Sequence, residues 1–76
     1  MKTIRLNDIS EGLEQATLRK WYVKENDLLK KGENLLAFET AKAIMEAPAP
    51  FDGQVLTLHV KPGDIVQKDE PLITLA

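Results

Sequence analysis

Residues 21–38 read WYVKENDLLKKGENLLAF, and residues 58–75 read LHVKPGDIVQKDEPLITL. Under a shift of 37 residues, six of these eighteen positions are identical and five more pair one large apolar residue with another. The turns match as well. Pro62-Gly63 suits a type II turn, and Asn26 aligns with Gly63, where asparagine tolerates the left-handed conformation. The sequence therefore predicts two copies of one unit, related by an approximate two-fold axis.

Turn-forming residues punctuate the whole chain, and short runs rich in β-branched and aliphatic residues lie between them. This pattern is typical of a small all-β sandwich or barrel. A helical stripe over residues 11–24 competes with it, but Thr17, Trp21 and Tyr22 favour extended structure there. We expect strands near 2–6, 17–22, 35–40, 43–48, 53–60 and 71–75, with short extended pieces near 27–29 and 64–66.

The composition narrows the class of protein. The 76 residues suffice for one small domain, and the chain has no cysteine, so its 43% of hydrophobic residues must stabilise it by packing alone. A net charge of -2, with no basic run beyond Lys30-Lys31, argues against nucleic-acid binding. No apolar stretch is long enough to span a membrane, and the first residues lack the pattern of a signal peptide. We therefore expect one domain over residues 1–76, with no nucleic-acid or membrane partner.

One lysine falls at the tip of an expected hairpin. Two strand-like stretches flank the turn Thr40-Ala41-Lys42-Ala43, so the Lys42 side chain should stand clear of the sheet. Its neighbours Ala41 and Ala43 are small and uncharged, which leaves the amine open to a modifying enzyme. Composition alone would make Lys42 one of ten ordinary basic residues.

The residues around this lysine narrow the interpretation. The segment from Phe38 to Pro50, followed by Asp52-Gly53, resembles the lipoyl domains of 2-oxo acid dehydrogenase complexes. In that family the lipoyl lysine lies in a Glu-Thr-Asp-Lys-Ala hairpin, followed by an acidic residue, prolines and a glycine. The matching residues are Glu39, Thr40, Lys42, Ala43, Glu46, Pro48, Pro50 and Gly53. The resemblance extends over essentially the whole chain, and its one departure is Ala41, which replaces the usual acidic residue.

The resemblance implies a flattened barrel or sandwich of two four-stranded antiparallel sheets, related by a pseudo-two-fold axis. It implies that Lys42 carries lipoic acid through an amide bond, which removes the positive charge of the lysine. The domain would then be a carrier without an active site of its own. Its partners would recognise it through the residues around Lys42, which are Glu39, Thr40, Ala41, Ala43 and Glu46. Residues Asp8 to Glu14 would form a loop near the lysine hairpin, which helps the decarboxylase to choose its carrier.

The partners that the resemblance implies are a lipoate-attaching ligase or transferase, a thiamine-dependent 2-oxo acid decarboxylase, an acyltransferase core and dihydrolipoamide dehydrogenase. An isolated domain of this kind is expected to be a monomer. Its expected location is the cytoplasm or, in a eukaryote, the mitochondrial matrix.

Two alternatives of other function classes share the expected fold. A biotin carrier would use Lys42 for carboxyl transfer, although Ala41 and Ala43 stand where biotinyl domains typically have methionines. An interaction domain would leave Lys42 unmodified.

Several residues receive structural predictions. An enzyme is not indicated, because the only histidine, His59, falls within an expected strand, and no metal-ligand cluster or phosphate loop is present. Asp27 and Asp64 occupy equivalent turns, which indicates an architectural role, and Met45 is expected to pack inward. Finally, the shift makes residues 5 and 42 equivalent, which places the hairpin and the chain termini at opposite ends of the sandwich.

Overall fold

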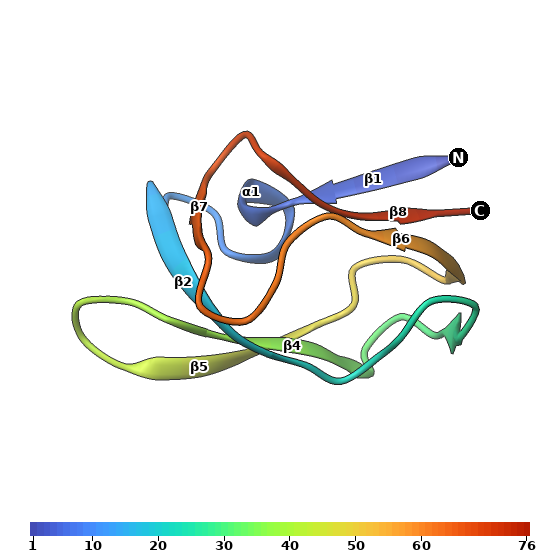
Figure 1. The fold of residues 1–76 in the computed structure, drawn as a ribbon, viewed down its shortest axis with the longest axis horizontal. Coiled ribbons are helices and arrows are strands. Elements are labelled where there is room, and N and C mark those ends of the chain that lie inside the picture. Colours follow the sequence, from blue (N-terminus) through green and yellow to red (C-terminus); the bar gives the residue numbers. More distant parts are fainter.

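Two antiparallel sheets of four strands each face one another across an apolar core (Figure 1). The computed structural model describes all residues from 1 to 76. Its elements are β1 (Lys2–Arg5), α1 (Leu6–Ile9), β2 (Gln15–Trp21), β3 (Leu28–Leu29), β4 (Asn34–Glu39), β5 (Ile44–Pro48), β6 (Gly53–Leu58), β7 (Ile65–Gln67) and β8 (Pro71–Leu75). One sheet has the order β1-β8-β6-β3 and the other β5-β4-β2-β7. The predicted all-β sandwich is confirmed, and the sheets do not close into a barrel.

The core consists of aliphatic residues and Phe38, and no polar side chain is buried in it. Bulges explain why two neighbouring residues of one strand both point inward. In β4 Leu35 is the extra residue of a register shift against β5, so Leu35 and Leu36 are both buried. In β8 Leu72 is the extra residue of the matching shift against β1, so Leu72 and Ile73 are both buried. The two halves of the chain therefore place equivalent pairs of residues in the core, Leu35 and Leu36 in one half and Leu72 and Ile73 in the other.

The turns repeat between the two halves in atomic detail. Asn26 and Gly63 both have positive φ angles, 77° and 98°, as the sequence predicts. The Asp27 carboxylate accepts a hydrogen bond from the Lys24 N–H at 2.9 Å, and the Asp64 carboxylate accepts one from the Lys61 N–H at 2.9 Å. The architectural role predicted for both aspartates is thus confirmed.

The shift of 37 residues does not hold for the first strand. Ile4 pairs with Ile73, and Ala47 pairs with Leu36, which is the counterpart of Ile73. Ile4 therefore corresponds to Ala47, a shift of 47 − 4 = 43 residues. The predicted equivalence of residues 5 and 42 is wrong, because the connection from β1 to β2 contains extra residues that the second half lacks.

Part of this extra connection is the single helical turn α1, which the sequence pattern does not predict. Its Leu6 side chain is buried, and the Asp8 carboxylate accepts a hydrogen bond from the Arg5 N–H at 2.8 Å. Four residues are too few to display a helical period, so this turn escaped prediction. The competing helix over residues 11–24 is absent, because β2 runs from Gln15 to Trp21. The other predicted strands agree with the structure to within two residues.

The hairpin between β4 and β5 and the two chain termini lie at opposite ends of the long axis (Figure 1). This arrangement confirms the prediction that the hairpin and the termini lie at opposite ends. The corrected register explains it, because Phe38 pairs with Met45 in the hairpin, and the counterpart of Phe38, Leu75, pairs with Lys2 at the termini. The chain ends therefore occupy, at one end of the sandwich, the place that the hairpin turn occupies at the other.

Candidate functional site

The hairpin turn holds Lys42 through its first residue, Thr40. The last cross-strand pair is Glu39 with Ile44, and the Thr40 N–H then donates to the Ala43 carbonyl at 2.9 Å. The Thr40 hydroxyl oxygen also accepts hydrogen bonds from the N–H groups of Lys42 at 3.2 Å and Ala43 at 3.3 Å. A threonine side chain that bonds to nearby backbone in this way defines a tight turn. Thr40, predicted as a recognition residue, therefore has a structural task in this turn.

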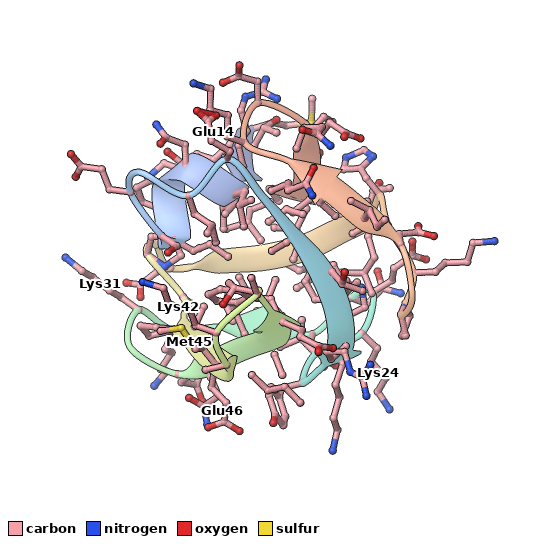
Figure 2. All side chains as sticks on the ribbon, turned by 90° about the vertical axis from the view of Figure 1, so that its left-hand side faces the viewer. Glu14, Lys24, Lys31, Lys42, Met45 and Glu46 are labelled. Carbon is pink, nitrogen blue, oxygen red and sulfur yellow. The ribbon has the colours of Figure 1, made fainter.

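Lys42 lies at the hairpin end of the molecule, which faces the viewer in Figure 2, and its side chain is exposed. Lys42, Ala41 and Ala43 are all exposed, and the two salt bridges of the protein involve other residues. The amine is thus accessible and is not held by a carboxylate. These features fit a group attached through an amide bond, since acylation of this amine breaks no ion pair and displaces no packed side chain.

The two predicted carboxylates beside the hairpin are both engaged with neighbouring strands. Glu39 forms a salt bridge with Arg19 of β2, in which Glu39 Oε1 lies 3.1 Å from Arg19 Nη1, and both side chains are about half exposed. Glu46 accepts hydrogen bonds from the Tyr22 hydroxyl at 2.5 Å and from the Asn34 side-chain amide at 3.3 Å. The hydrogen bond with Glu46, then desolvation and the charge of the same carboxylate, raise the pKa of Tyr22 above its usual value.

These partners were not predicted. Arg19 lies in β2 and Tyr22 directly after it, and this segment neighbours the hairpin only after the sheet has formed. Asn34 lies in the hairpin itself, at the start of β4, and is 12 residues away from Glu46 in the sequence. Nothing in the local sequence indicates which of the basic and polar residues would reach the two glutamates.

An open groove runs along one side of the hairpin. It is lined by residues 15–17 at the start of β2, by the hairpin residues 39–42, and by Leu13, Glu14 and Ile65. The loop after α1 is held there by Lys68, whose N–H donates to the Glu14 carbonyl at 3.0 Å and whose ammonium lies 3.4 Å from the Glu14 carboxylate. Part of the loop predicted near the lysine hairpin therefore does lie beside it, whereas Asp8 is used in capping α1.

Met45 does not pack inward as predicted, because 48% of its surface is exposed. Met45 pairs with buried Phe38, so its side chain lies on the face of the sheet that faces the core. It stays exposed because β5 is an edge strand and the hairpin extends past the core. Figure 2 shows Met45 at the same end of the molecule as Lys42. His59, expected within a strand, lies just beyond the end of β6. It is exposed, and its ring is 2.7 Å from the Thr74 hydroxyl.

Known proteins share both the sequence pattern and the fold of this chain. A biotin and lipoyl family model, described as "Biotin-requiring enzyme", matches residues 2–75. The solution structure of the lipoyl domain of the 2-oxoglutarate dehydrogenase complex from Azotobacter vinelandii superimposes with a TM-score of 0.76 at 28% identity, over 100% of this chain and 96% of that one. The Kluyveromyces lactis urea carboxylase also superimposes with a TM-score of 0.76, over 100% of this chain and 6% of that one, but its 21% identity indicates the fold alone.

Curated relatives point in the same direction. The chain is 33% identical over 75 residues to the dihydrolipoyllysine-residue acetyltransferase component of the pyruvate dehydrogenase complex of Acholeplasma laidlawii, covering 99% of this chain and 14% of that protein. It is 36% identical over 70 residues to the same component from Bacillus subtilis, covering 92% and 16%. The chain thus spans only about a sixth of the length of these relatives. With the family model matched from end to end and the fold and hairpin in agreement, the chain belongs to the biotin and lipoyl attachment family, and its resemblance to lipoyl domains is confirmed.

Proposed function

We propose that this domain is a lipoyl carrier, which presents lipoic acid on Lys42 and shuttles acyl groups and reducing equivalents within a 2-oxo acid dehydrogenase complex. The observation that carries the proposal is the exposed, unpaired Lys42 in a braced turn at the end of the molecule farthest from the termini. The similarity to acyltransferase components of such complexes supports it.

The chain contributes position and exposure to this function. Thr40 fixes the turn, and the alanines on either side of Lys42 leave its amine open to a ligase or transferase. When bound, the dithiolane ring of lipoic acid supplies the redox and acyl-transfer chemistry that this cysteine-free chain lacks. A flexible arm fixed to a folded domain also gives a high effective concentration at each partner active site.

We propose that partners recognise the hairpin together with its flanking carboxylates. Arg19 holds Glu39, while Tyr22 and Asn34 hold Glu46, so both carboxylates have fixed positions relative to Lys42. The proposed partners are the lipoate-attaching enzyme, a thiamine-dependent decarboxylase, an acyltransferase core and dihydrolipoamide dehydrogenase. The domain itself would be a carrier and leave catalysis to them.

The intact mass of the protein tests the proposal. We expect expression with lipoate and a lipoate ligase to add the mass of one lipoyl group, and Lys42→Ala to abolish this addition. Lys31→Ala is the matched control, because Lys31 is also an exposed lysine in a turn and its replacement should leave the modification intact. If biotin ligase adds the mass of a biotinyl group and lipoate ligase adds nothing, the protein is a biotin carrier and the proposal is wrong.

A further inference from the structure

The groove beside the hairpin has no task in the carrier function proposed above. Lys42 itself lines it, together with the neighbouring residues of the turn. A group attached to the Lys42 amine therefore begins beside this groove.

The apolar part of the groove comes from three separate segments of the chain. Leu13 is half-buried and packs on the core, Ala16 is buried in β2, and Ile65 begins β7 with 61% of its surface exposed. Ala41 adds a fourth apolar side chain next to the lysine. Polar residues, among them Glu14 and Glu39, line the rest of the groove. An apolar patch with polar groups around it suits a ligand that is largely apolar and carries no charge.

The modified lysine meets this description. Acylation converts its ammonium into a neutral amide, and the attached arm consists of methylene groups that end in a sulfur-containing ring. Covering this arm removes apolar surface from water on both sides of the contact. We propose that the groove binds the lipoyl arm of the same chain, with Leu13 and Ile65 against its apolar part. This inference rests on the proposed function, since it requires an arm on Lys42.

Such binding would give the carrier a resting state. The arm would lie against the domain between visits to partner enzymes, and a partner would have to compete with the groove for it. The dithiolane ring would be shielded from small reductants while the arm is bound.

The two-fold relation supplies a matched control. Under the 37-residue shift, Leu28 of β3 is the counterpart of Ile65, and 79% of its surface is exposed. Leu28 lies on the other sheet, away from the hairpin, and does not line the groove. Replacing either residue by serine removes an exposed apolar side chain from the start of a short strand, but only Ile65→Ser changes the groove.

Amide and methyl NMR spectra of the unmodified and lipoylated proteins test the inference. We expect lipoylation to shift the signals of Leu13, Ala16 and Ile65, in addition to those of the turn. Ile65→Ser should lower the ratio of bound to free arm by about fivefold, because it removes one side chain of apolar contact. It should therefore reduce the shifts at Leu13 and Ala16 and speed reduction of the ring by a water-soluble phosphine, whereas Leu28→Ser should change neither.

Shifts confined to residues 40–43, with ring reduction as fast as in free lipoamide, would overturn the inference. Intact mass separates this result from failure of the carrier function, because it shows beforehand whether Lys42 is lipoylated. If no ligase modifies Lys42, the same spectra are recorded on Lys42→Cys alkylated with a lipoyl iodoacetamide, which reacts at a single site because the chain has no other cysteine. An arm of this kind that leaves the groove signals unchanged would overturn the inference equally.

Discussion

The Thr40 hydroxyl should control how firmly the turn presents Lys42. Thr40→Val keeps the β-branched shape but removes the acceptor of the two N–H groups of Lys42 and Ala43, at 3.2 and 3.3 Å. These contacts are long and exposed, so together they stabilise the closed turn by about 1 kcal/mol, at the low end for hydrogen bonds. That free energy corresponds to about fivefold in the equilibrium between the open and closed turn.

Exchange of the Lys42 and Ala43 amide protons with water, measured by NMR, reports this equilibrium directly. We expect exchange at both amides to rise about fivefold in Thr40→Val, in proportion to the opening of the turn. The kcat/KM for lipoylation should fall by no more than the same factor, because an enzyme that accepts only the closed turn responds to its population. The melting temperature should change little, since the turn is exposed and outside the core.

Thr40→Ser is the matched variant, because it retains the hydroxyl and loses only a methyl group. It should show exchange rates near those of the unaltered protein. The reasoning is refuted if amide exchange is the same in Thr40→Val as in the parent, or if Thr40→Ser exchanges as fast as Thr40→Val.

Three further substitutions test the frame that supports the hairpin. Trp21→Phe should lower the free energy of unfolding in urea by about 1–2 kcal/mol, because it removes the 2.9 Å hydrogen bond to the partly buried Val60 carbonyl; an unchanged value would contradict this. The raised pKa of Tyr22 means that its contact with Glu46 stabilises the fold fully below about pH 10 and is lost as the pH rises through the folded-state pKa. Absorbance titration of this single tyrosine should give a lower pKa in Glu46→Gln, and an unaltered pKa would exclude the contact in solution. Asn26→Ala should cost about 1 kcal/mol in thermal or urea unfolding because alanine resists the φ of 77°, whereas Asn26→Gly should be tolerated.

The sequence predicted those features that local chemistry determines. Asn26 and Gly63 indicate turns because both residue types tolerate positive φ angles. The repeat predicts that equivalent strands occur in both halves of the chain. The hairpin and its exposed lysine follow from the same local pattern. All of these features survive in the structure because neighbouring residues in the sequence determine them.

Apart from the short helical turn α1, the features that escaped prediction depend on contacts between separate strands. The bulges at Leu35 and Leu72 and the extra residues before β2 determine the true register of β1 against β5, which no constant shift could indicate. Met45 has an inward-facing position in the alternation of β5, but its exposure depends on how far the hairpin extends past the core. The contacts of the two glutamates likewise exist only once β2, β4 and β5 lie side by side.

The corrected register has a consequence for how the backbone is connected. Ala76 corresponds to Glu39 by the shift of 37, and Met1 corresponds to Ile44 by the shift of 43, so the junction of the two chain ends mirrors the turn Thr40–Ala43. A peptide with that four-residue sequence, inserted between Ala76 and Met1, would close the backbone into a ring with a lysine turn at each pole. The same ring could be cut between Ala41 and Lys42 to give a circular permutant in which both sheets keep all their strand pairs.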